Sequence, residues 1–420
     1  MPLFAKLDFD EIGTSGLKQS GGLIYEEFLP KLRGELGRRI FDEMRRNDDA
    51  VGALLYSIDM VLRPVDWYVQ TASQDNIDLE RADFLSSSLH DMSRSWGNFI
   101  EETLTMLPFG FAPHEIVYKR RRGIVPNSPG ESSKYDDGRI GIRKMALLSQ
   151  ASVERWEFDP DGGLAGLWQE GRIFIPIQKL LLFRPYAELN NPEGRSILRV
   201  AWQSWYFKKK IQQLEAIGLE RDLVGYPVGY LDARILNSDE PENQTIVSEI
   251  EDIIYNIRRD ELEGALFPLA WDENGNPMFK FELLSSGGQR QFDLNATIQR
   301  YDRAIVRAGL ADFLMLGGGE SAGSYALSKD KTELFELAAG AHLDSIEDVL
   351  NRHLVPRLME ANGWTGDFPE IRHGQVERID PRTIAETLQI MATSGADVFP
   401  DTNIENVLRR EMKLPEKEIE

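Results

Sequence analysis

A glycine-rich polar stretch is the part of this sequence whose residue types come closest to those of a ligand-binding loop. It consists of Leu316, Gly317, Gly318, Gly319, Glu320, Ser321, Ala322, Gly323 and Ser324. A phosphate-binding loop needs a strand before it, a helix after it and a Lys-Ser or Lys-Thr pair after its last glycine. Here the preceding segment has a helical pattern, Ser324 and Tyr325 follow the last glycine, and the glycine spacing misses the dinucleotide fingerprint by one residue. The stretch therefore predicts no nucleotide site, and we expect no cofactor.

The residues that commonly bind metals do not form a recognisable motif. The chain has no cysteine, and its five histidines are His90, His114, His342, His353 and His373. Only His342 and His353 could share a helix face, and their separation in sequence is too long for one ion. Asp159, Asp161 and Glu170 match three positions of a calcium loop, but Leu164 stands where its glycine should be, so we expect a hairpin turn. We predict no metal, no catalytic residue, and histidines in the core or on the surface.

Two other classes of function remain open on composition alone. The sequence has 69 acidic residues, so clustered carboxylates such as Asp8, Asp10 and Glu11 with a distant partner could serve a metal-dependent hydrolase or nuclease. An acidic scaffold or adaptor without catalytic activity is the second alternative. Both rest on the abundance of acidic residues rather than on a defined spacing.

Length and charge limit the fold and the partners. A chain of 420 residues with 42% apolar residues is expected to form two or three structural units. No apolar run is long enough for a membrane helix, and the absence of cysteine predicts a fold without disulfides. A formal charge of −21 argues against a basic face that wraps nucleic acid, although it does not exclude proximity to DNA.

The first half of the chain has the alternating pattern of a mixed α+β unit. A helical pattern with Val51, Leu54, Ile58 and Met60 on its apolar side covers 32–62, is interrupted around 45–49, and stops at Pro64. We expect further helices at 78–90 and 95–106, and strands at 65–69, 110–118, 144–148, 153–158, 164–169 and 180–185.

A long helix is predicted from the N-cap candidate Ser196 to Leu223. Its apolar residues, including Trp202 and Trp205, point in several directions, which is typical of a helix packed on several sides. Mid-helix, Lys208, Lys209 and Lys210 form a basic run that is either a solvated face or a set of charges meeting acidic neighbours or phosphates.

The rest of the chain is predicted as an insert followed by two helices. The insert at 225–284 contains strands at 228–231, 265–269 and 278–284, a helix at 241–259 and a hairpin turn at Asn274 and Gly275. A helix at 290–308 precedes the glycine-rich stretch, and the longest helix, at 331–359, follows it. The latter has a single apolar stripe, and Pro356 should kink or end its last turn. A strand at 368–371 and two helices at 381–393 and 402–412 complete the prediction.

The order of helix, insert, helix, glycine-rich loop and long kinked helix resembles that of bacteriophage portal proteins, particularly the Mu-like and thermophilic tailed-phage group. The resemblance covers roughly 40–362, and the order of its motifs is more specific than any one motif. The segments that carry it are Asn47 to Leu54 leading to Trp67, Gly110 to Ala112 with Glu115 to Tyr118, Gly194 to Arg199, and Gly317 to Ala326 leading into the helix that ends Leu354 to Leu358.

The resemblance implies an α+β portal fold with a mixed α+β wing, a two-helix stem, a small α/β clip, a long kinked wing helix and a short helical crown. The implied boundaries are wing 1–195, stem helices 196–224 and 289–310, clip 225–288, tunnel loop 311–330, wing 331–380 and crown 381–420. By the same resemblance, the chain is a non-enzymatic virion protein that forms a ring, typically dodecameric, at one capsid vertex. Its implied partners are double-stranded DNA passing through the channel, the large terminase, a head-tail adaptor and the major capsid protein, with no membrane. Residues 316–324 would then line the DNA channel.

Overall fold

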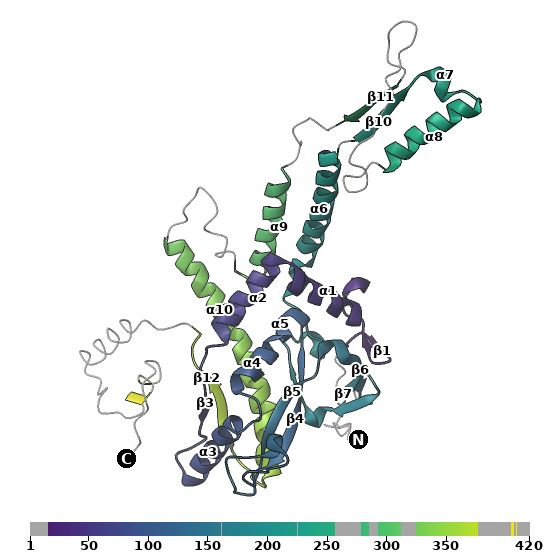
Figure 1. The fold of residues 1–420 in the computed structure, drawn as a ribbon. Coiled ribbons are helices and arrows are strands. Elements are labelled where there is room, and N and C mark those ends of the chain that lie inside the picture. The colour runs from purple at the N-terminus through teal and green to yellow at the C-terminus, as the bar shows by residue number, and fades with distance from the viewer. Residues whose placement is uncertain are drawn as a thin grey trace, which may run out of the picture. The chain divides into compact units, whose positions relative to one another are not determined.

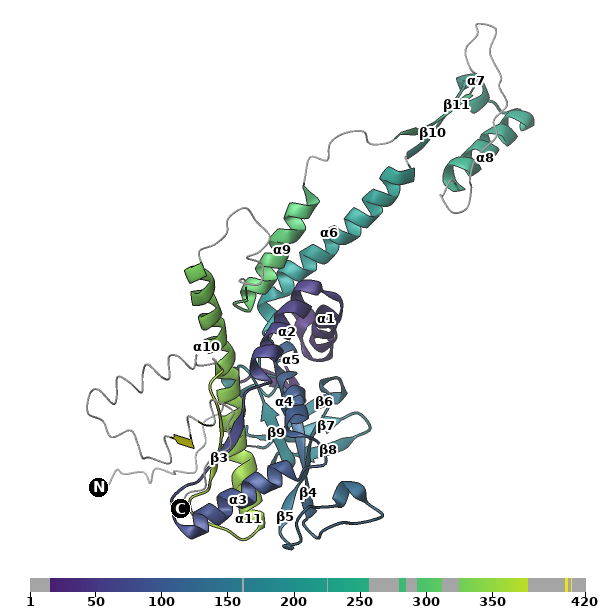
Figure 2. The same ribbon diagram turned by 60° about the vertical axis from the view of Figure 1, so that its left-hand side comes forward.

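The computed structural model describes residues 16–160, 162–224, 226–256, 279–284, 293–311 and 325–376, together with 405–406 and 409 (Figures 1 and 2). The chain divides by its contacts into two compact units, one of Met1–Ala201 with Ile305–Glu420 and one of Trp202–Ala304. Several predictions concern residues outside the described ranges: the strand at 265–269, the turn at Asn274 and Gly275, the glycine-rich stretch 316–324, and most of the two C-terminal helices.

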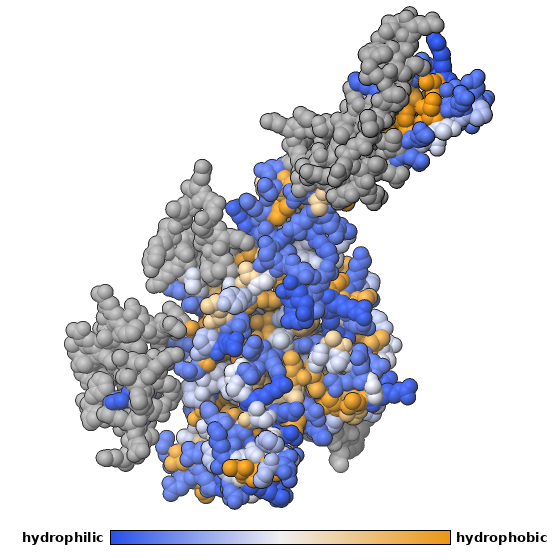
Figure 3. Space-filling model, viewed as in Figure 1, coloured by the Kyte–Doolittle hydropathy of each residue, from blue (hydrophilic) through white to orange (hydrophobic). Residues whose placement is uncertain are grey.

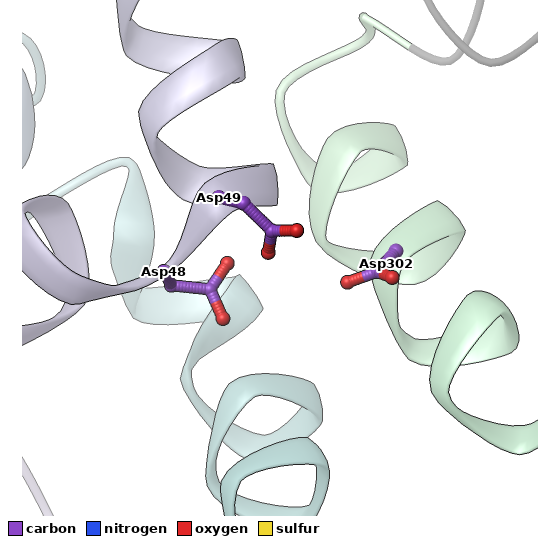
Figure 4. Close-up of side chains that lie close together, drawn as sticks. All are labelled: Asp48, Asp49 and Asp302. Atoms are coloured by element: carbon purple, nitrogen blue, oxygen red, sulfur yellow. The ribbon is translucent and has the colours of Figure 1, made fainter. Parts of the chain in front are cut away.

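Two helices, α1 (Gly34–Asn47) and α2 (Asp49–Leu62), replace the single interrupted helix expected from the pattern. The break lies at Asp48, whose extended backbone and side chain cap α2: its Oδ1 accepts a hydrogen bond from the Val51 amide at 3.0 Å. Asp49 begins the helix, and Figure 4 shows both side chains at this end of α2. An aspartate is favoured here because its carboxylate satisfies an amide that has no partner within the helix.

The first sheet of the larger unit has the strand order β5-β4-β9, with β4 (Ala112–Arg120) antiparallel to both β5 (Ile140–Leu147) and β9 (Leu180–Phe183). Helices α3 (Asn76–His90), α4 (Trp96–Leu104) and α5 (Met106–Phe109) precede it in the chain. The outer strand β9 is a continuous apolar run, and all four of its residues are buried, so both of its faces are covered.

The second sheet has the order β6-β7-β8 and is entirely antiparallel, with β6 (Val153–Phe158), β7 (Leu164–Gln169) and β8 (Ile173–Pro176). The expected hairpin turn between β6 and β7 is confirmed: the Gly163 amide donates to the Asp159 side chain and Gly162 has a φ of 83°. Trp156 lies in a core shared with Leu180 of the first sheet and with Phe111, which directly precedes β4. Sequence patterns did not predict β8 or the short pair β1 (Gln19–Ser20) and β2 (Leu23–Ile24).

A long helix, α10 (Tyr325–Val349), passes through a π-helical segment at Leu350–Leu354 into α11 (Val355–Ala361). The chain then forms β12 (Glu370–His373), which is antiparallel to β3 (Trp67–Gln70). Asn351 fixes this small sheet to the helix, because its side chain donates to the Ile371 carbonyl at 2.9 Å and accepts from the Ile371 amide at 2.8 Å. The predicted apolar stripe of the long helix is confirmed, since all seven of its positions are buried: Phe335, Ala339, Leu343, Ile346, Leu350, Leu354 and Leu358.

The smaller unit contains most of two helices, α6 (Leu198–Val224) and α9 (Leu294–Ala308), and the segment between them. In that segment β10 (Tyr226–Leu231) pairs antiparallel with β11 (Phe279–Leu284), and α7 (Ala233–Leu236) and α8 (Pro241–Asn256) lie between these strands in sequence. The predicted helices and two of the three predicted strands are confirmed here, while α7 was not expected.

The remaining short helices of the described residues are of the 3-10 type. They are Pro30–Leu32, Pro129–Glu131, Gln150–Ser152, Ile177–Lys179 and Glu188–Asn190. Among the helices of the described residues, none combines the length and the apolar character that crossing a membrane requires.

Candidate functional site

The two flanks of the glycine-rich stretch are described by the structure, whereas residues 316–324 themselves lie outside the described ranges. On one side, α9 ends in a Schellman motif: the Leu310 amide donates to the Arg307 carbonyl and the Ala311 amide to the Val306 carbonyl. Leu310 occupies the left-handed position with a φ of 60°, where glycine is the usual residue. On the other side α10 already begins at Tyr325, so residues 325–330 are helical and the loop expected at 311–330 is shorter than we predicted.

The end of α9 is held firmly against α2. A Cβ atom at Gly309 would lie 2.4 Å from Cδ1 of the buried Leu54, so any larger residue would displace that side chain. Ala311 is completely buried and Val306 is buried beside it in the motif. The chain therefore enters the glycine-rich stretch from a fixed point.

A small cavity of about 130 Å³ lies beside this point, between α2, the end of α9 and α10. Its lining is mostly apolar and also includes His342, Arg195 and Ser196. Burial lowers the pKa of His342 to about 4, and its ring meets Tyr186 edge to face at 6.2 Å. A neutral imidazole in an apolar wall has a structural role, as expected for the histidines.

The other histidines also show no metal-binding arrangement. His114 is fully buried between the rings of Phe99 and Phe183, and burial lowers its pKa to about 3. Within the described parts of the chain, no histidine belongs to a group of side chains that could hold an ion. The candidate carboxylates Asp8, Asp10 and Glu11 lie outside the described ranges.

The three consecutive lysines of α6 have different surroundings. Lys208 is 1% exposed, and its Nζ lies 2.5 Å from Oδ1 of Asp302, which projects from α9 (Figure 4). Lys209 Nζ lies 5.2 Å from the ring centre of Trp205, while Lys210 is exposed. Of the two alternatives for this run, the acidic neighbour applies to Lys208, whose charge Asp302 compensates inside the unit. Sequence reasoning missed Asp302 as its partner.

The two tryptophans of α6 also differ. Trp205 is buried within the chain, whereas Trp202 is partly exposed and stacks on Tyr206 at 5.6 Å. Among the side chains of α6 that the structure describes in this unit, the large exposed apolar ones are Phe207, Leu214 and Ile217. Phe207 is also stacked on Tyr301 of α9, 6.3 Å away. The assignment of Trp202 and Trp205 to subunit packing stays a prediction, and the structure adds these exposed residues as candidates.

Pro356 does not end the long helix, which continues to Ala361. The irregularity lies just before it, where the Val355 amide donates to the Leu350 carbonyl, five residues back. Proline has no amide hydrogen and crowds the preceding turn, so a wider π turn is an accommodating geometry. The expected distortion at Pro356 therefore takes the form of a π-helical segment.

The arrangement thus contains a fixed entry to a glycine-rich stretch, a pair of helices joined by a buried ion pair, and no recognisable catalytic group among the described residues. The sequence model of the protein family described as "Portal protein of Mu bacteriophage" matches residues 38–410. The chain belongs to this family. Portal proteins are structural components of the virion and not enzymes, so the hydrolase and nuclease alternative is removed.

The fold is also found among solved structures of gene transfer agent (GTA) particles. One chain, from "Virion of native gene transfer agent (GTA) particle", is 13% identical, with 90% of this chain and 94% of that chain covered and a TM-score of 0.50. Another, from "Neck of empty GTA particle computed with C6 symmetry", is 15% identical, with 90% and 95% covered and a TM-score of 0.51. At these identities the likeness establishes a shared fold over nearly the whole length.

Proposed function

We propose that this chain forms a closed ring at one capsid vertex and that double-stranded DNA passes through the ring during genome packaging and ejection. The observation that carries the proposal is the match of the portal family over residues 38–410. The presence of the same fold in the neck of a GTA particle supports it. A ring of twelve subunits is the size that the resemblance to portals implies.

The division of the chain fits the parts of a portal. We assign most of α6 and α9 to the stem and the segment containing β10, β11 and α8 to the clip. The larger unit takes the role of the wing, and residues 381–420 that of the crown. With 27 residues, α6 is about 40 Å long, so helices of this length side by side would line a long stretch of a channel. Its exposed Leu214 and Ile217 support contact with neighbouring stems, because a helix with apolar residues on several sides is usually packed on several sides.

We further propose that residues 316–324 act as the tunnel loop that touches DNA in the channel. A duplex carries about one phosphate charge per 1.7 Å, so a strongly basic channel would hold it, while an acidic one lets it slide. The net charge of −21 and Glu320 within the loop support the second behaviour. Lys209 and Lys210 are then the stem lysines available to face DNA or a neighbouring subunit.

The partners follow from the same proposal: the large terminase and a head-tail adaptor at the clip, and the major capsid protein around the ring. Electron microscopy of the purified chain tests the ring directly. Closed rings with a central hole are the expected result. The proposal would be contradicted if the purified chain stayed monomeric at high protein concentration and at several salt concentrations.

A further inference from the structure

Helix α2 carries apolar residues on two opposite faces. One face is buried in the core and consists of Val51, Leu54, Ile58 and Leu62. The opposite face is exposed and contains Ala53, Tyr56 and Met60, spaced by three and four residues, which we name the α2 stripe. Our expectation that Met60 lies on the buried side is therefore wrong, since Met60 is 58% exposed. A helix that is apolar on all sides is normally covered on all sides.

Helix α10 shows the same feature. Its buried face begins with Phe335, Ala339 and Leu343, while Leu334, Leu337 and Ala341 on the opposite face are exposed. We name these three the α10 stripe. Leu334 is 53% and Leu337 74% exposed, so two large apolar side chains meet solvent on one face of the helix. Like the α2 stripe, it follows three- and four-residue spacing and forms one continuous strip.

The buried faces of the two helices point toward each other. Ile58 of α2 lines the same small cavity as Phe335 and Ala339 of α10, and the helices are in contact. Figure 1 shows them side by side in the larger unit, and Figure 3 shows pale and orange surface near α2 on this face. Because each stripe lies opposite a buried face, the two stripes are exposed on opposite sides of the helix pair. Ile58 and Phe335 line one cavity, so the stripes also lie at a similar height along the pair.

We infer that the α2 stripe of one copy packs against the α10 stripe of the next copy, an interface that rests on the proposed ring. A ring with one subunit type needs a heterologous interface, in which two different and complementary patches lie on opposite sides of each subunit. Two exposed apolar strips of similar length, on opposite sides of one helix pair, meet this requirement. Pairing them makes a continuous layer in which α10 and α2 alternate from copy to copy around the ring.

Charges at one end of the two stripes favour this pairing. Trp67, just after α2, contacts His373, whose Nε2 lies 3.0 Å from Asp344 of α10, so α2 and α10 run in the same direction. Arg63 follows Met60 by three residues, lies 3.1 Å from Glu101 and keeps 48% of its side-chain exposure. Asp344 follows Ala341 by three residues and keeps 74% of its exposure beside His373, so both charges can make a further contact. When parallel stripes meet, the guanidinium of one copy comes close to a carboxylate of the next.

Cysteine cross-linking tests the interface without background, because the chain has no cysteine. One substitution in the α2 stripe (Ala53→Cys, Tyr56→Cys or Met60→Cys) is combined with one in the α10 stripe (Leu334→Cys, Leu337→Cys or Ala341→Cys) in all pairings. After mild oxidation of assembled protein, at least one pairing is expected to give a ladder of covalent dimers and larger species on a denaturing gel. Each single variant should stay monomeric on that gel, because the interface is heterologous.

Electron microscopy of the same samples separates this inference from the proposed function. Rings without a ladder in any pairing overturn the interface and leave the ring standing. Absence of rings in the unsubstituted chain contradicts both. The control combines Met60→Cys with Ile173→Cys, an exposed position on β8 outside both stripes. If this control gives a ladder as strong as the stripe pairings do, the cross-links come from random collisions, and the interface is overturned.

Discussion

The ammonium group of Lys208 lies 2.5 Å from a carboxylate oxygen of Asp302 and joins α6 to α9 inside the smaller unit. The Lys208 side chain is almost wholly removed from water, while that of Asp302 keeps 18% of its exposure. Removing a lysine charge from water is expensive unless an opposite charge compensates it. The pair therefore fixes which faces of the two helices meet, next to the stacked rings of Phe207 and Tyr301.

Replacing one partner of this pair should destabilise the protein clearly. For Lys208→Ala we expect a loss of about 2–4 kcal/mol in the free energy of unfolding, because Asp302 is left partly buried without its partner. Chemical denaturation measures this. The matched control is Lys210→Ala on the exposed side of α6, with an expected change within about 0.5 kcal/mol. Equal effects of the two substitutions would show that the buried pair does not hold the helices together.

The buried His342 should make stability depend on pH. Its folded pKa of about 4 lies below the ordinary value of 6.5, so the unfolded chain binds the proton more readily. The stabilising contribution is complete above pH 6.5 and is lost as the pH falls toward 4. Between pH 7 and pH 5 this amounts to about 2 kcal/mol. We expect His342→Phe to remove this part of the pH dependence, measured as the difference between the denaturation curves of variant and parent.

In that comparison His114, whose pKa is also lowered by burial, contributes equally to both proteins and cancels. Parallel stability profiles of the parent and His342→Phe across this range would mean that the pKa of His342 is not lowered in the folded protein.

The side chain of Asn351 should contribute more to the free energy of unfolding than its neighbours on the helix surface. It satisfies both backbone groups of Ile371 on the outer edge of β12, so Asn351→Leu leaves an amide and a carbonyl without these partners. A cost of about 1–3 kcal/mol is expected, again from denaturation. Arg352→Ala, which breaks the exposed ion pair with Asp348, is the control and should cost less than about 1 kcal/mol. A cost for Asn351→Leu no larger than that of the control contradicts the role.

The sequence predicted the long helix best, because its apolar period is local information. The spacing of its apolar residues also indicates the π-helical segment. The buried positions Ile346, Leu350, Leu354 and Leu358 follow one another in steps of four. A regular helix turns once in about 3.6 residues, so three such steps rotate the stripe by roughly 120° away from the core. A wider turn at Leu350–Leu354 offsets this drift.

Contacts between distant parts of the chain were beyond such reasoning. The sequence left open whether Lys208 is solvated or meets an acidic neighbour, because nothing near it in sequence indicates that Asp302 will lie against it. The strand β8 follows a turn, has only four residues and ends in Pro176, so its alternation is too short to read. The exposure of Met60 was missed for a related reason: periodicity shows that a helix is apolar, but not how many of its faces a single copy can cover.

The glycine-rich stretch itself gives the most direct test of the channel. Replacing Gly317, Gly318 and Gly319 together by alanine restricts the backbone, because alanine lacks much of the conformational freedom of glycine. The flanks are fixed by the motif that ends α9 at Leu310 and by α10, which begins at Tyr325, so we expect rings to form as before, checked by electron microscopy. If the stretch moves around DNA, packaging or retention of DNA falls, measured as nuclease-protected DNA per filled head. Ser321→Ala removes one hydroxyl without restricting the backbone and should package normally. Normal packaging by the triple alanine variant would remove the tunnel-loop role from this segment, while a defect confined to that variant ties DNA passage to the freedom of its glycines.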